Sequence, residues 1–228
     1  NKSIYFKKGD ALSGIQNTIF HEIREMMETL FAEVQLDYTP LRTSARHIAA
    51  NRFAAAVLLP RSDFEKKIYD TGFNVVELSR LYSKSCSQVL LRMGEVLQGR
   101  LFMYAALYEP DAEKQWRVAY WTGCSNDTDT DANVYGGDGL FPRRGRMVVP
   151  GSLVDLAIRG KKPQLVSHVT LLDGGDEDGL VGMAEPLIIS GAVTKVALVA
   201  LLEQSRDLLL PQIERLKPIL VEGFHGHL

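Results

Sequence analysis

Apolar residues in the first hundred positions recur at the three- and four-residue spacing of amphipathic helices. This spacing predicts a helix around residues 20–30, with Asn17 or Thr18 as its N-terminal cap. A second helix is predicted over residues 44–60, where Pro60 ends the apolar stripe. Three shorter helices are predicted next, over residues 61–70, 75–82 and 85–97.

After Gly99 the pattern changes to short apolar runs of the kind that form strands. A helix is predicted over residues 152–159, and a closing helix over residues 209–221. The predicted strands are residues 101–109, 116–123, 182–189 and 194–202. The stretch GKKPQLVSHV is predicted to lead into a further strand. A chain that places its helices first and its strands later is typical of an α+β fold.

Composition limits the function classes that remain. The chain has 228 residues, and its 46% hydrophobic content is enough for one large or two small globular cores. A net charge of -2 gives no field that would recruit nucleic acid or anionic lipid, so any DNA contact needs a local patch. The absence of a bilayer-length apolar run and of a signal-peptide pattern predicts a cytoplasmic protein without membrane contact.

The two cysteines, Cys86 and Cys124, belong to no CxxC pair, so neither a disulfide framework nor a thiolate metal site is indicated. Cys124 is a candidate redox reporter, on weak grounds, because no cationic neighbour is visible in the sequence.

Candidate chemistry begins at the sequence HEIRE, residues 21–25. On a helix His21 and Glu25 project from one face about a turn apart, so both side chains can reach one metal ion. The sequence differs from the zinc-binding H-E-x-x-H motif in one position, because Glu25 replaces the second histidine. The alternative interpretation is an ordinary solvated helix face.

The next predicted helix, SARHIAANRFAAAVLLP, strengthens the metal hypothesis. Together with HEIRE it resembles the ImmA/IrrE family of metallopeptidase-like proteins, whose second helix has the pattern E-x-x-A-N-x-F-A-x-x-L-L-x-P. His47 stands where that family has its glutamate ligand. The matching positions are Ala50, Asn51, Phe53, Ala54, Leu58, Leu59 and Pro60.

The resemblance implies a three-ligand zinc site made of His21, Glu25 and His47, with Glu22 as the general base that activates water. It also implies a protein substrate such as a transcriptional repressor. The alternative is that the site has been lost and that His47 and Glu25 form a hydrogen-bonded pair between two helices. In the family a sheet and a helix precede the motif helix, so we expect further residues before Asn1.

Residues 75–97 resemble the helix-turn-helix-like segment that follows the peptidase core in this family. Ser85 is the predicted cap of its last helix. DNA recognition requires cations and amides at the start of that helix. The segment offers few of them, so a structural or partner-docking role is favoured and DNA binding stays open. The candidates are Lys84, Ser85, Ser87, Gln88 and Arg92.

Three stretches in the second half of the chain carry a further resemblance: SLVDLAIRGKKPQLV, MAEPLIISGAVTKVALVAL and LLPQIERLKPILVE. Their order resembles a GAF domain, a sensory module in which helices back an antiparallel sheet that can enclose a small ligand. The resemblance also makes a homodimer an expectation. The predicted domains are therefore a zincin-like core over residues 1–60, a helix-turn-helix-like segment over 61–99 and a GAF-like domain over 100–228.

Two functions follow from these resemblances. The first is a regulatory zinc-dependent metallopeptidase that cleaves a partner protein under control of the GAF-like domain. The second is a non-catalytic transcriptional regulator or sensor that keeps the peptidase fold as a binding surface.

Overall fold

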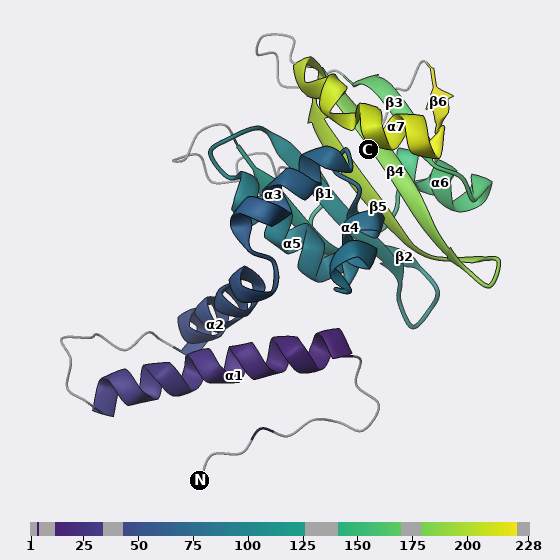
Figure 1. Cartoon of the computed structure of the whole chain (residues 1–228). Helices are drawn as coiled ribbons and strands as arrows, with labels where there is room; N and C mark the ends of the chain where they lie inside the picture. The colour runs from purple at the N-terminus through teal and green to yellow at the C-terminus, as the bar shows by residue number, and fades with distance from the viewer. Residues whose placement is uncertain (1–3, 5–11, 34–42, 126–140, 170–178, 223–228) are drawn as a thin grey trace.

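A six-stranded sheet forms the centre of the second half of the chain, and helices lie on both of its faces (Figure 1). The computed structural model describes residues 4, 12–33, 43–125, 141–169 and 179–222. The strand order is β2-β1-β5-β4-β3-β6, and neighbouring strands are antiparallel except for the parallel pair β3 and β6. The strands are β1 Met103–Pro110, β2 Trp116–Cys124, β3 Gln164–Val169, β4 Leu180–Ile189, β5 Ala192–Leu202 and β6 Ile219–Val221.

Five helices, within residues 12–97, precede this sheet in the described part of the chain. The predicted α+β fold class with an antiparallel sheet is confirmed. In the described ranges, no helix is both long and apolar enough to span a bilayer. The helices are α1 Leu12–Glu33, α2 Thr43–Leu58, α3 Arg61–Asp70, α4 Val75–Tyr82, α5 Cys86–Leu97, α6 Leu153–Gly160 and α7 Leu210–Leu216, with a 3-10 helix, η2, over Glu203–Leu209.

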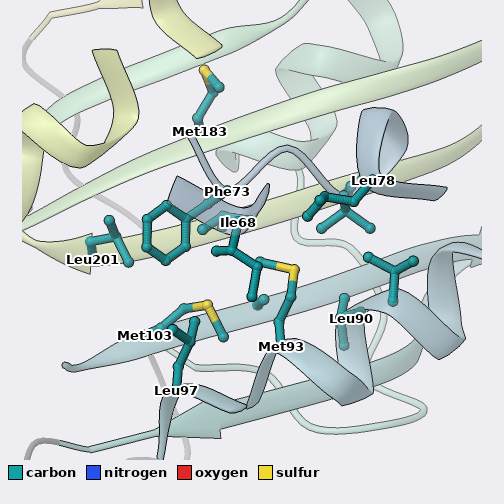
Figure 2. Packing of buried hydrophobic residues seen from close by; sticks show 14 of the residues in the cluster. Ile68, Phe73, Leu78, Leu90, Met93, Leu97, Met103, Met183 and Leu201 are labelled. Carbon is teal, nitrogen blue, oxygen red and sulfur yellow. The ribbon is translucent and has the colours of Figure 1, made fainter. Parts of the chain in front are cut away.

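Alternation along the strands divides the buried residues between two hydrophobic layers. On β1, Met103 and Leu107 face the layer under α3, α4 and α5, whereas Tyr104 and Tyr108 face the layer under α6. Side chains of successive strand residues point to opposite faces, so each strand contributes to both layers. Figure 2 shows the first layer, where Met93 and Leu97 of α5 approach Met103 and Leu201 of the sheet. The core of α3–α5 therefore continues across Gly99 into the sheet.

Helix α5 lies directly on β2. A Cβ atom at Gly94 would overlap Thr122 Oγ1 and stand 3.0 Å from Thr122 Cβ, so glycine permits this close approach. The helix begins at Ser85 with a capping box: the Ser85 hydroxyl accepts from the backbone N–H of Gln88, and the Gln88 side chain accepts from the backbone N–H of Ser85. The predicted cap is confirmed.

Two predicted helix boundaries are wrong. Helix α1 begins at Leu12, so Asn17 and Thr18 lie inside it and cap nothing; the apolar spacing continues upstream through Leu12 and Ile15. The predicted closing helix over residues 209–221 ends at Leu216 instead. Lys217 adopts a left-handed conformation and proline follows at position 218, so the chain leaves the helix and enters β6.

Candidate functional site

His21 lies near the middle of α1 between two carboxylates. Its Nδ1 is 3.4 Å from Glu22 Oε1, and its Nε2 is 3.8 Å from Glu25 Oε1. The His21 side chain is 11% exposed, whereas those of Glu22 and Glu25 are 43% and 29% exposed. The helix therefore brings three of the four predicted site residues together.

The two predicted ligand atoms, Nε2 and Oε1, are 3.8 Å apart. Two zinc bonds of about 2.0–2.2 Å at a tetrahedral angle would place them roughly 3.3–3.6 Å apart, so a small side-chain shift would be needed to bind one ion. The third predicted ligand is His47, whose position lies in α2 but whose side chain lies outside the described residues. Among the side chains that the structure does describe, no group of three His, Cys, Asp or Glu forms a metal site. The zinc site stays a prediction. Glu22 lies beside Nδ1, the ring nitrogen that does not face Glu25.

The two cations proposed for DNA contact, Lys84 and Arg92, are used in contacts within the chain. Lys84, which is 8% exposed, donates from Nζ to Gln16 Oε1 of α1. Arg92 donates to Leu59 O at 3.2 Å and to Glu95 at 2.9 Å. These contacts link α1 to the turn before α5, and link α5 to the end of α2.

The amides and hydroxyls at the start of α5 are also engaged. Ser85 and Gln88 form the capping box, and the hydroxyls of Ser85 and Ser87 lie 3.0 Å apart. The opposite side of α5 is packed on the sheet, where Met93 and Leu97 are fully buried. A structural role for this segment is therefore favoured over DNA recognition.

Aromatic residues gather on the sheet face under α6. We call the set Phe102, Tyr104, Tyr108, Trp121 and Phe141 the aromatic layer. Tyr104 stacks on Trp121 with ring centroids 6.4 Å apart and lies 4.9 Å from the ring of Phe141. Its hydroxyl donates to Pro142 O at 2.6 Å. Burial first, and then the neighbouring Tyr108, raise the pKa of Tyr104 well above its usual value.

The segment that supplies Phe141 and Pro142 is held in place by β2. Val118 N donates to Arg146 O, and Val148 N donates to Trp116 O, both at 2.9 Å. These hydrogen bonds give partners to backbone N–H and C=O groups on the outer edge of β2. They also fix the start of the segment over the aromatic layer.

Tyr108 carries the chemically unusual group of this layer. The side chain is 2% exposed. Its hydroxyl lies close enough to the Tyr104 hydroxyl for each group to act on the pKa of the other, but no hydrogen bond of normal geometry joins it to any described residue. Burial raises the pKa of this phenol, so it stays neutral at ordinary pH. A buried hydroxyl without a partner costs about 1–3 kcal/mol. It is therefore a site where a bound molecule would gain a hydrogen bond.

Neither cysteine has the environment of a redox sensor. Both are buried. Burial raises the pKa of Cys124 to about 12 against a smaller lowering by the backbone of Met103, and its sulfur donates to Leu101 O at 3.3 Å. A thiol with so little thiolate is unreactive.

The sequence did not single out Tyr104 or Tyr108 as site residues. Their signal is the alternation in MYAALYEP, where tyrosines at positions 104 and 108 share a face with Ala106. This pattern indicates an aromatic face with a small residue at its centre. Only the fold shows that the hydroxyl of Tyr108 finds no hydrogen-bond partner in the part of the chain that the structure describes.

Comparison with known proteins gives a fold but not a family. No protein-family model matches the chain, and no curated protein matches it. Among solved structures, a transcriptional regulator of Mycobacterium tuberculosis is similar with a TM-score of 0.54 and 16% sequence identity. The match covers 89% of this chain and 60% of the regulator, so the chain spans less than two thirds of that protein. At this identity the likeness shows a shared fold alone.

A GAF domain/HD domain protein from Geobacter sulfurreducens also matches, with a TM-score of 0.32 and 13% identity. That match covers 69% of this chain and 90% of the other. Its TM-score is too low for any conclusion about this chain.

Proposed function

We propose that this chain is the sensory part of a transcriptional regulator and that its GAF-like sheet binds a small ligand at the aromatic layer. The overall fold shared with a transcriptional regulator supports the regulatory class. The antiparallel sheet with helices on both faces is the arrangement expected for a GAF-like sensor. A peptidase activity is not required by this proposal. Homodimer formation and a protein substrate stay predictions.

The observation that carries the proposal is the hydroxyl of Tyr108, which has no hydrogen-bond partner among the described residues and lies inside a layer of aromatic side chains. Ligand sites are typically lined by apolar and aromatic groups with a few polar groups that fix the ligand's orientation. In the aromatic layer the rings supply the apolar surface, and Tyr108 supplies a neutral hydroxyl that can donate or accept. A ligand with a flat apolar portion and one polar atom fits this chemistry.

Intrinsic fluorescence tests the proposal directly. The chain has two tryptophans, and both Trp116 and Trp121 pack in or against the buried cluster that contains the aromatic layer. Their emission therefore reports on this side of the sheet. A panel of nucleotides, aromatic acids and short-chain carboxylic acids would be titrated while emission and Tm are followed.

A compound that binds here should shift the emission and raise Tm. Tyr108→Phe should weaken binding of that compound about tenfold, because one neutral hydrogen bond contributes about 1–1.5 kcal/mol. Tyr120→Phe is the matched control, because Tyr120 is 37% exposed and lies outside the aromatic layer. Equal loss of affinity in both variants would place the binding site elsewhere.

A zinc peptidase is the second candidate, and the pairing of His21 with Glu25 on α1 favours it. If zinc is bound, His21, Glu25 and His47 would hold it, and the ion would acidify a water and polarise a peptide carbonyl. What supports this candidate is the position of His21 and Glu25 on one face of α1, with Nε2 and Oε1 3.8 Å apart.

Elemental analysis of protein purified without chelators separates the two candidates. About one zinc per chain, lost in both His21→Ala and His47→Ala, would support the metal site. Glu22→Gln should then retain the metal and lose any cleavage of a partner protein. Protein without metal would leave the sensor proposal as it stands and exclude the peptidase.

A further inference from the structure

Glu185 is a buried carboxyl group in the middle of β4. It is 9% exposed and is the one charged residue in the strand LVGMAEPLII. Met183, two positions earlier, packs in the layer under α3–α5, whereas Ala184 packs in the opposite layer. The Glu185 side chain therefore points toward α4 and α7, away from the aromatic layer.

Side chains of two helices converge on this carboxyl. Asn74 Nδ2 donates to Glu185 Oε2 at 2.7 Å, and Gln212 Nε2 of α7 approaches the same oxygen at 3.4 Å. We call Glu185, Asn74 and Gln212 the Glu185 cluster. Asn74 and Gln212 are 0% and 3% exposed, so water does not replace these contacts.

The cluster links three elements that are far apart in the chain. Asn74 is also the N-cap of α4, because its Oδ1 accepts from the backbone N–H of Glu77 at 2.6 Å. Glu77 in turn forms an ion pair with Arg215 of α7. The start of α4 and the body of α7 are therefore both tied to β4 and to each other.

Few charges act on Glu185. Of the charged groups on the elements packed around it in the described ranges, Arg80 of α4 lowers its pKa, less than the hydrogen bond from Asn74 does. Glu77 and Arg215 pair with each other, and Lys195 of β5 pairs with Glu109. Burial dominates over the hydrogen bonds from Asn74 and Gln212 and raises the pKa of Glu185 from 4.5 to about 7.

Hydrogen bonding within the cluster fits a neutral carboxyl. Gln212 Oε1 is buried and has no partner among the described residues, and the approach of its Nε2 to Glu185 is long. The nitrogen and oxygen of an amide exchange places when the group turns by 180°. In the turned position the Gln212 oxygen accepts a hydrogen bond from the O–H of a neutral Glu185 carboxyl, a donor that an ionised carboxylate lacks.

We propose that the Glu185 cluster is a proton-sensitive contact, closed when Glu185 is neutral and weakened when Glu185 loses its proton, through which β4 holds the start of α4 and helix α7. An ionised carboxylate has a high free-energy cost in this buried place. Movement of α7 or of the first turn of α4 away from β4 lowers this cost, because it admits water. The contact lies on the sheet face opposite the aromatic layer. It stands whether or not a ligand binds there.

Stability against urea between pH 5 and pH 8 tests the proposal. The folded protein binds this proton more tightly than the unfolded chain, so the stabilisation is complete below pH 4.5 and is lost as the pH rises to about 7. Between pH 5 and pH 8 the folding equilibrium constant should fall further in the wild type than in Glu185→Gln. The extra fall should be about tenfold to a hundredfold. Glu109→Gln, which removes a partly buried carboxyl paired with Lys195, should keep the wild-type slope.

Equal slopes for the wild type and Glu185→Gln would overturn the proposal. Hydrogen exchange on the wild type gives a second test that needs no variant. After correction for intrinsic rates, opening of residues 74–82 and 209–216 should increase between pH 6 and pH 8, while α6 should not respond. An equal response in α6 would show a global effect and would also overturn the proposal.

Discussion

The side chain of Asn74 binds the carboxyl of Glu185 through its nitrogen, at 2.7 Å, and caps helix α4 through its oxygen. The two residues are 111 positions apart in the chain. One amide thus satisfies a buried acid on the sheet and an open backbone N–H at a helix start. The beginning of α4 is positioned by the sheet as well as by its own sequence.

Replacement of Asn74 by alanine should therefore lower the free energy of unfolding by more than the loss of an ordinary N-cap does. Loss of an N-cap costs about 1 kcal/mol, and loss of a hydrogen bond to a buried acid costs about 1–3 kcal/mol more. We expect Asn74→Ala to lower the free energy of unfolding by about 2–4 kcal/mol in urea titrations. Ser152→Ala is the matched control, since Ser152 caps α6 through Asp155 N without a buried acid. An equal loss in both variants would show that the Glu185 contact contributes nothing.

The two tyrosines of the aromatic layer should respond in opposite directions to loss of their hydroxyls. Tyr104→Phe removes the hydrogen bond to Pro142 O and should destabilise the fold by about 1 kcal/mol. Tyr108→Phe removes a buried hydroxyl without a described partner and should stabilise it by about 1 kcal/mol. Thermal unfolding of the ligand-free protein measures both. A loss in Tyr108→Phe as large as that in Tyr104→Phe would mean that its hydroxyl has a partner.

Cysteine labelling tests the inert environment of Cys86 and Cys124. At pH 8 a thiol whose pKa is about 12 is almost entirely protonated, and both sulfur atoms are buried. Reaction with a disulfide reagent should therefore be at least about a hundredfold slower in native buffer than in denaturant, because it requires local opening. Unfolded protein should give two reactive thiols. A thiol that reacts at once in native buffer would restore the redox hypothesis.

Much of the fold could be predicted because local signals are strong. Ser85 with Gln88 three positions later predicts the start of α5, and Pro60 predicts the end of α2. The end of α7 was missed because the apolar spacing runs past Leu216, whereas the proline at position 218 and the left-handed Lys217 stop the helix. Periodicity alone does not register such backbone breaks.

The chemistry of the sites was harder to predict. His21 and Glu25 are four positions apart, so their proximity follows from helix geometry alone. The partners of Glu185 come from α4 and α7, and no local pattern indicates them. A single acid in an otherwise apolar strand was the available signal. The burial of Tyr108 likewise depends on strand pairing and on the segment that begins at Phe141.

Packing of α5 on β2 gives the last prediction, at Gly94. Alanine normally favours a helix over glycine by about 1 kcal/mol. At this position the added methyl group would meet the Thr122 side chain, and overpacking costs about 1–3 kcal/mol. We therefore expect Gly94→Ala to lower the free energy of unfolding by about 1–2 kcal/mol. Gly14→Ala in α1, where nothing lies within 4 Å, should instead be neutral or stabilising.

A double-mutant cycle with Thr122→Ala identifies the cause of the Gly94 effect. Removal of the Thr122 hydroxyl and methyl leaves only its Cβ, at 3.0 Å, so a small shift of the helix then suffices. Thr122→Ala should therefore cost less in the Gly94→Ala background than in the wild type, with a coupling energy of about 1 kcal/mol. Independent effects of the two substitutions would mean that α5 does not rest on β2 at this point.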